Sequence, residues 1–543
     1  MVFARRSTTL LAAIIASCAM VLSLTACTSD NKTVVDGQTT VTSNSAGGVA
    51  VFTPSDGITL NQQTPLNKWA KLVPDLAKAL ADAGFKKGDI DHTTSDSLAK
   101  QSRAIQDFVV DHLSNNTTDD SGIAIAPDNM TLLVAPVVEA DASTRQYGDY
   151  ISQNLSTNDA TDGEATSDGE SSEDDSSKDD SSNTESDSTA SDEQAQAVDR
   201  LVSSLKLAKE SGMHVVLLGN SIEGYKPDAF VKFSDAQTIG KLQAEKMVSK
   251  LKLDKASKDN PKYIEVLLPY TAVDEKGNAN DSTFAQEAFR GIWQVLGSYY
   301  QKGVVESPSG TLDGKSTEND WQAVAYDAAK EGSTAKVLDK RLAKTDGQST
   351  LTRIDGIITM NDYIASEVVK ELDDLGYTGS AADINPQITI SGIVGNITGK
   401  KDLSRDAVPD PIKSPENDNA NDSSSSDDDA DEDTSASDKD RYSQWPLVTG
   451  YGAYVSNIPS IVNGKQWMTG MEDRQTIATD IAQACAKLNK DEALNSMPSI
   501  RNSEVGGVKK IPTISEPLLA VSASNLKSAL IDPGYISLAD AGL

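Results

Sequence analysis

Short, wholly apolar stretches alternate with segments of helical periodicity along most of this chain, and this alternation constrains the fold more than any other feature. Such stretches lie at 132–138, 215–218, 263–268 and 354–359. Strands that are apolar on both faces have to be covered on both faces, as they are in a parallel sheet flanked by helices. The sequence therefore predicts an α/β fold built on parallel sheets.

The alternation occurs in two successive halves of the chain, which predicts two similar lobes. The first helix is expected to begin at Pro65, and further helices are expected at 98–113, 194–209, 284–296 and 364–375. Further strands are expected at 57–60, 388–393 and 446–449. In an open parallel sheet, ligands bind where loops leave the carboxyl ends of the strands, so a binding site is expected there.

Two acidic tracts interrupt this pattern, at 157–193 and 414–440, and they carry most of the net charge of -32. Their Ser, Asp and Glu residues cannot bury enough apolar surface to offset chain entropy, so we expect both tracts to be disordered. The acidic run 427–433 lacks the glycine and final glutamate of an EF-hand loop, which favours a repulsive spacer over a calcium site. The first tract follows a strand, so it forms either an acidic flap beside a ligand cleft or an insertion that points into solvent.

The N-terminal segment has the features of an export signal. Arg5 and Arg6 precede an apolar stretch at 10–24, and residues 24–27 (Leu-Thr-Ala-Cys) resemble a bacterial lipoprotein processing site. We therefore expect a signal peptide at 1–26, a lipidated Cys27 and a flexible stalk over 27–55, on the extracytoplasmic face of the cell membrane. An uncleaved anchor is the alternative, although the stretch is shorter than the about 20 residues of a typical spanning helix.

The sequence contains no recognisable catalytic or metal-binding motif. His92, His112 and His214 lie outside any HExxH pattern, and no Gly-x-Ser-x-Gly motif occurs. Cys485 is the one cysteine beyond the signal and the lipidation site, so we expect a buried thiol and no disulfide. Because no compact basic stripe is present, nucleic acid is not expected as a partner. These features predict a protein that is not an enzyme and uses no cofactor or metal.

Several motifs, in one order along the chain, resemble a known family. They are Lys-Trp at 68–69, GKLQA at 240–244, Asn-Asp at 361–362, WPLVTGYGAYVSNIPSIVNGKQWMT at 445–469 and the tail EPLLAVSASNLKSALIDPGYISLADAG at 516–542. From residue 56 onward, apart from the acidic tracts, the chain resembles the sugar-binding proteins of ABC importers. The similarity is to the xylose and multiple-sugar branch of the type I periplasmic binding proteins.

The resemblance implies two Rossmann-like lobes that are joined by three crossing segments and close around a sugar. Lobe 1 would span 56–233 and 474–517, and lobe 2 would span 234–473 and 518–543. The protein would then be a monomeric receptor that traps a solute and delivers it to the permease subunits of an ABC importer.

The resemblance also implies a set of ligand-binding residues. Trp69 stands where the family stacks an aromatic ring on the sugar, with a core tryptophan as the alternative, and Lys68 precedes it. Asn361 stands at a hydrogen-bonding position, whereas Asp362 is expected to cap the following helix. The remaining expected contacts differ from the residues usual in the family: Asn220, Ser221, Phe284, Gln286, Tyr451 and Glu472.

These departures remove charged groups that normally hold sugar hydroxyls. Asn-Ser at 220–221 replaces Asp-Arg, and Gly-Tyr-Gly at 450–452 replaces Gly-Gln-Asp. Hydrogen bonds to charged groups contribute about 1.5–3 kcal/mol each, so stacking by Tyr451 and Phe284 would suit a larger or less polar ligand. Two hypotheses follow: a carbohydrate receptor of an ABC importer, or a ligand sensor or surface interaction protein that keeps the fold without transport.

Overall fold

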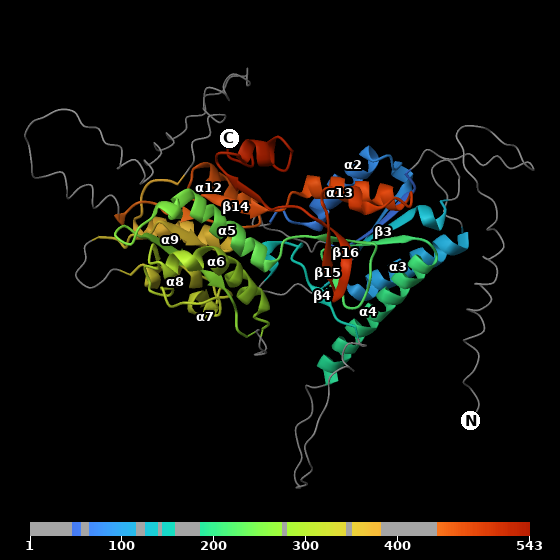
Figure 1. Ribbon diagram of the computed structural model, residues 1–543, viewed down its shortest axis with the longest axis horizontal. Helices are drawn as coiled ribbons and strands as arrows, with labels where there is room; N and C mark the ends of the chain where they lie inside the picture. The colour runs from blue at the N-terminus through green and yellow to red at the C-terminus, as the bar shows by residue number, and fades with distance from the viewer. Residues whose placement is uncertain are drawn as a thin grey trace, which may run out of the picture. The chain divides into compact units, whose positions relative to one another are not determined.

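Seven strands form the larger sheet of the computed structural model (Figure 1). Their order is β15–β16–β7–β5–β3–β1–β2, and all neighbours are parallel except β15 and β16. The strands are β1 (Gly48–Pro54), β2 (Ile90–Ser95), β3 (Met130–Val134), β5 (His214–Leu218), β7 (Ala229–Lys232), β15 (Ile500–Val505) and β16 (Val508–Ser515). The structure describes residues 46–55, 65–115, 125–138, 144–157, 185–273, 280–343, 350–381 and 442–543, which belong to one compact unit, Ser45–Leu543.

Two pairs of helices cover the faces of this sheet, because successive strand residues point to opposite sides. Leu133 and Val216 join a core with α2 (Trp69–Asp82) and α13 (Arg474–Leu488). Their neighbours Leu132 and Val215 join a second core with α3 (Leu98–Asn115) and α4 (Glu185–Glu210). The continuous apolar runs in the sequence are therefore the signature of strands buried on both sides.

Four parallel strands form a second sheet in the order β10–β8–β12–β13. They are β8 (Lys262–Val266), β10 (Val305–Glu306), β12 (Gly356–Ile358) and β13 (Leu447–Val448). One core joins this sheet to α5 (Ala236–Leu251) and α6 (Thr283–Gln301), and another joins it to α8 (Ser333–Arg341) and α9 (Asp362–Leu375). Helices α5 and α6 lie side by side (Figure 1), and their backbones meet at Gly240 and Gly291.

Short elements complete the described part of the chain. The paired strands are β4 (Asn154–Leu155) with β6 (Ser221–Ile222), β9 (Leu268–Pro269) with β11 (Ala325–Tyr326), and β14 (Met468–Met471) with β17 (Leu519–Ser522). The short helices are η1 (Lys87–Asp89), η2 (Pro127–Asn129), η3 (Arg145–Tyr147), η5 (Leu253–Lys255), α7 (Trp321–Val324), η7 (Val455–Asn457), α12 (Ile458–Val462), η8 (Leu494–Ser496) and η9 (Lys527–Ile531). None of the described helices combines the length and apolar character needed to cross a membrane.

The chain passes three times between the elements of the two sheets, which we call the first lobe (larger sheet) and the second lobe (smaller sheet). The crossings lie between β7 and α5, between β14 and α13, and between β16 and β17. At the first two, the Ser234 amide donates a hydrogen bond to the Glu472 carboxylate over 2.7 Å. The predicted α/β class with parallel sheets in two lobes is thus confirmed.

The structure differs from the predicted boundaries at several places. Helix α2 begins at Trp69 and not at Pro65, because Lys68 is its extended N-cap residue. Strand β1, Gly48–Pro54, lies within the range 27–55 expected to be a stalk, and it occupies an inner position of the larger sheet. Its short apolar run is hidden by the Ser, Thr and Gly residues before it. Helix α4 begins at Glu185, inside the acidic tract predicted at 157–193, where acidic residues favour a helix N-terminus.

Several other predictions lie outside the described residues. They concern the signal peptide and Cys27, the strands at 57–60 and 388–393, residues 158–184 of the first acidic tract, the second tract at 414–440 and its run 427–433.

Candidate functional site

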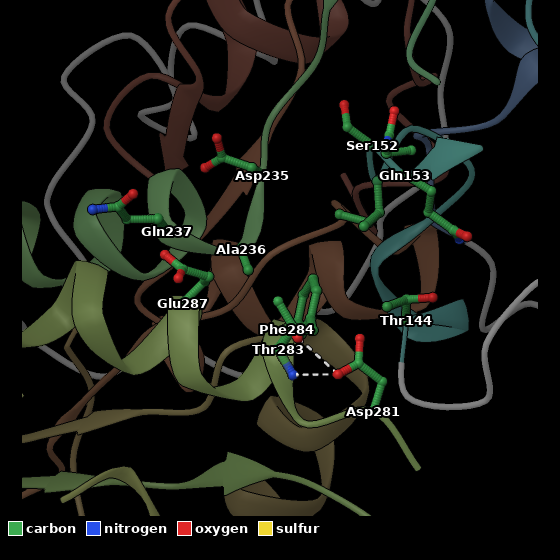
Figure 2. Close-up of a pocket in the computed structure, with 12 residues that line it drawn as sticks. Thr144, Ser152, Gln153, Asp235, Ala236, Gln237, Asp281, Thr283, Phe284 and Glu287 are labelled. Carbon is green, nitrogen blue, oxygen red and sulfur yellow. Dashed lines mark hydrogen bonds between the residues drawn. The ribbon is translucent and has the colours of Figure 1, made fainter. Parts of the chain in front are cut away.

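A cavity of about 510 Å³ lies between three chain segments (Figure 2). One segment follows β3, and the other two are the starts of α5 and α6. The cavity is therefore bounded by the first lobe on one side and by the second lobe on the other. Its lining residues are Thr144, Ile151, Ser152, Gln153, Asn154, Asp235, Ala236, Gln237, Asp281, Thr283, Phe284 and Glu287.

Two aspartates at helix starts give the second-lobe wall its acceptors. Asp235 caps α5 by accepting hydrogen bonds from the Thr238 amide at 2.7 Å and hydroxyl at 2.6 Å. Burial tends to raise the pKa of Asp235, but the hydrogen bonds from Thr238 and Lys232 outweigh it and lower the pKa. Asp281 accepts from the Thr283 amide at 2.9 Å and hydroxyl at 2.7 Å, which lowers its pKa as well. Both carboxyls are therefore ionised at neutral pH.

The first-lobe wall of the cavity is held by Asn220 and Ser221, two of the predicted ligand residues. The Asn220 side chain accepts from the Gln153 amide at 2.9 Å, and its own amide donates to the Pro136 carbonyl at 2.9 Å. The Ser221 hydroxyl donates to the Asn154 side chain at 2.8 Å. The structure thus places both residues behind the wall, where they position Gln153 and Asn154.

Of the two predicted residues on α6, Phe284 lines the cavity, whereas Gln286 does not. The Phe284 ring packs against Tyr147 with 4.6 Å between centroids. The Gln286 amide donates to the Ser282 hydroxyl at 2.7 Å, within the first turn of the helix.

Trp69 lies in the core of the first lobe with 3% of its surface exposed. Its ring meets Tyr150 edge-on at 5.1 Å and Phe233 at 5.7 Å. Lys68 forms an ion pair with Asp149 at 2.7 Å. The position is that of the core-tryptophan alternative, and a stacking role for Trp69 stays a prediction.

Asn361, and not Asp362, caps helix α9. The Asn361 side chain accepts from the Ile364 amide at 2.9 Å and donates to the Gln146 side chain at 3.2 Å. The prediction for Asp362 was wrong, since it is the first helical residue and its carboxylate accepts from Tyr454, Gln466 and Thr469 at 2.7–2.9 Å. Burial raises the pKa of Asp362 to about 6.

Tyr451 and Glu472 belong to a buried network at the crossing segments and do not line the cavity. The Ser234 hydroxyl lies 2.6 Å from the Tyr451 hydroxyl and donates to Glu472, and the Tyr451 hydroxyl lies 3.5 Å from Glu472. Burial raises the pKa of Glu472 to about 7, although these hydrogen bonds act in the opposite direction.

Sequence reasoning missed most of the lining residues. Asp235 and Asp281 carry a usable signal, because each is followed within three residues by a Thr whose backbone amide donates to the aspartate, a pattern typical of helix starts. Residues 144–154 carry only a weak sequence signal, which consists of two tyrosines and an isoleucine in a polar loop beside an acidic tract. Their position depends on contacts with residues far away in the sequence.

In the described part of the chain, no group of three or more His, Cys, Asp or Glu side chains is arranged to hold a metal ion. Cys485 is fully buried in α13, and burial raises the pKa of its thiol, as expected for a structural cysteine.

Neither a protein-family model nor a curated protein matches the chain. Solved structures do match, and the following are solute-binding or sugar-transport proteins of ABC systems. A solute-binding protein from Clostridium phytofermentans with bound β-D-glucose is 17% identical, with a TM-score of 0.43 over 91% of this chain and 99% of the other. A carbohydrate transporter solute-binding protein from Chloroflexus aurantiacus in complex with D-glucose is 18% identical, with a TM-score of 0.42 over 91% and 98%. A periplasmic ribose ABC transporter protein from Conexibacter woesei is 13% identical, with a TM-score of 0.42 over 90% and 96%.

Proposed function

We propose that this protein is an extracytoplasmic receptor of an ABC importer, that it is anchored through lipid on Cys27, and that it binds a carbohydrate between its two lobes. The observation that carries the proposal is the cavity of about 510 Å³, which has polar side chains from both lobes in its largely apolar walls and a size within the range of about 300–1,000 Å³ for small-molecule sites. The motif order along the sequence supports the same family of functions.

The chemistry of the lining favours a neutral, hydroxyl-rich solute. Asp235, Asp281 and Glu287 can accept hydrogen bonds from hydroxyl groups, and Gln153 and its neighbours supply amides that both donate and accept. Phe284 offers an apolar surface to the C–H face of a sugar ring. Among the described lining residues there is no Lys or Arg, so an anionic solute would meet like charges from Asp235, Asp281 and Glu287.

A thermal-shift screen of the protein, purified in detergent, against monosaccharides, oligosaccharides and nucleosides tests this proposal. A solute at about 100 times its dissociation constant adds about 2.7 kcal/mol to the stability of the folded state. We expect a shift for one sugar class that Phe284→Ala abolishes. Tyr299→Ala is the matched control, because Tyr299 lies on the same helix with its hydroxyl on Asp254, outside the cavity lining.

A panel with no shift would favour the second hypothesis, a sensor or surface interaction protein without transport. A neighbouring sensor-kinase gene would point the same way, whereas neighbouring permease and ATPase genes would favour import. Lipid attachment is tested separately by metabolic labelling with an alkyne fatty acid, which Cys27→Ser should abolish.

A further inference from the structure

Residues 144–151, which we call the cleft segment, are held firmly by the first lobe. The Asp149 carboxylate pairs with Lys68 at 2.7 Å and accepts from the Trp69 amide at 3.1 Å. The Asp149 amide donates to the Asn67 carbonyl at 2.8 Å. The Tyr150 hydroxyl donates to the Lys68 carbonyl at 2.5 Å, and its ring stacks on Phe233 at 4.6 Å.

The same segment is held by the second lobe. The Gln146 side chain accepts from Asn361 at 3.2 Å, and its carbonyl accepts from the Tyr454 hydroxyl at 2.7 Å. The Tyr147 ring lies 4.6 Å from Phe284 and 6.2 Å from Tyr451.

The aromatic side chains of the cleft segment are buried more deeply than those of an ordinary surface loop. Tyr150 is part of a first-lobe core and Tyr147 is part of a second-lobe core, each with 1% of its surface exposed. Between them, Gly148 has φ of +100°, and a Cβ there would lie 2.5 Å from the Asn67 carbonyl oxygen. The path of the segment therefore depends on a glycine at this position.

The cleft segment covers five of the nine residues that the sequence resemblance assigns to a ligand. It contacts Lys68, Trp69, Phe284, Asn361 and Tyr451. The residues that follow it, Ser152, Gln153 and Asn154, line the cavity. The side-chain amide of Gln146 and the ring of Tyr147 thus make hydrogen bonds and ring contacts that the resemblance assigns to a solute.

We propose that the cleft segment is a built-in occupant of the inner cleft, by which we mean the space between the lobes that the five predicted ligand residues named above surround. It joins the two lobes when no solute is present, and it confines a solute to the outer cavity, where it forms one wall. The occupancy stands independently of any transport role, whereas the confinement of a solute rests on the proposed function.

Hydrogen–deuterium exchange of the solute-free protein, resolved by mass spectrometry, tests the occupancy. We expect the peptide that contains the Asp149 amide to exchange at least about a hundredfold more slowly than an unstructured chain. Gly148→Ala should raise exchange in this peptide by about tenfold or more. Gly376→Ala is the matched control, because Gly376 has φ of +91° and a Cβ added there would meet nothing within 4 Å.

Fast exchange of the segment in the unaltered protein would overturn the occupancy, as would equal exchange in the Gly148→Ala and control variants. If Gly148→Ala does not fold, Asp149→Asn removes the ion pair with Lys68 while it keeps the side-chain shape, and it should also raise exchange. Circular dichroism of each variant separates local release from unfolding.

The same measurement with saturating D-glucose or D-xylose tests the confinement. Exchange of the cleft segment that stays equal or slows on solute binding supports it, whereas faster exchange means that the solute displaces the segment and overturns it. If neither probe nor the wider panel shifts the melting temperature, the proposed function fails, and the occupancy is still decided by the solute-free experiment.

Discussion

Glu472 makes stability depend on pH, because its pKa is raised by burial to about 7 from an ordinary value of 4.5. A carboxyl whose pKa is higher in the folded state favours folding when protonated, so its contribution is lost as pH rises from about 4.5 to about 7. Glu472→Gln resembles the protonated form and can still accept from the Ser234 amide. At pH 8 we expect this variant to be more stable than the unaltered protein by about 1–3 kcal/mol, since each pKa unit corresponds to about 1.4 kcal/mol.

Urea unfolding at pH 4.5 and pH 8 measures the effect. The difference between the two proteins should nearly vanish at pH 4.5, and the exposed Glu504→Gln should behave like the unaltered protein at both values. A Glu472→Gln variant that is less stable at pH 8 would contradict the assignment of an unfavourably buried charge.

Asn361 is expected to act first as a helix cap, because its side chain accepts from the Ile364 amide. Asn361→Ala should lower the free energy of unfolding by about 0.5–2 kcal/mol. Asn361→Ser keeps an acceptor for the cap but loses the donor to Gln146, so it should recover most of the loss. Equal loss in both variants, measured by denaturant unfolding, would assign the effect to the Gln146 contact instead.

At the scale of elements, the contact between α5 and α6 depends on two glycines. A Cβ at Gly240 would lie 2.2 Å from the Ala288 carbonyl oxygen, and one at Gly291 would lie 2.0 Å from that of Gln237. Because both clashes are with backbone, Gly240→Ala should separate the helices and destabilise the protein by about 1–3 kcal/mol. The exposed Glu245→Ala on the same helix is the control, and thermal unfolding would detect the difference. Equal melting temperatures would show that the helices can shift at little cost.

The sequence predicts most of these elements because their signals are local. The apolar runs of β3, β5, β8 and β12 and the helical spacing of α6 and α9 need no knowledge of distant residues. Strand β1 was missed because its apolar run is short and follows a polar segment. A shift of one residue separates the predicted cap Asp362 from the actual cap Asn361, since both residue types are good N-caps.

The candidate site was harder to predict than the elements, because its walls come from segments that are distant in the sequence. Gln153 of the cavity lining is held by Asn220 across 67 positions, and the predicted ligand residue Asn361 meets Gln146 across 215. A loop's composition indicates that it is polar but not which surface it contacts. Five of the residues expected to face a ligand therefore contact the cleft segment instead: Lys68, Trp69, Phe284, Asn361 and Tyr451.

At the scale of the whole molecule, the cleft segment and the crossing network should make the two lobes unfold together. Tyr147 adds to the core of the second lobe and Tyr150 to that of the first, so separating the lobes would expose both aromatic rings. Two bodies coupled by such burial unfold in one cooperative transition, and weaker coupling splits it. We expect a single calorimetric transition for the unaltered protein near neutral pH and two transitions, or one distinctly broader, for Gly148→Ala.

The control for this prediction is Gly376→Ala, which places a methyl group at a similar backbone angle on the second lobe alone. It should lower the melting temperature without splitting the transition, because Gly376 ends α9 and does not belong to the cleft segment. Two transitions in the unaltered protein would mean that the lobes are energetically independent despite their shared contacts. A single sharp transition in Gly148→Ala, with altered exchange in the cleft segment, would assign the coupling to the three crossings and to the buried Ser234–Glu472 hydrogen bond.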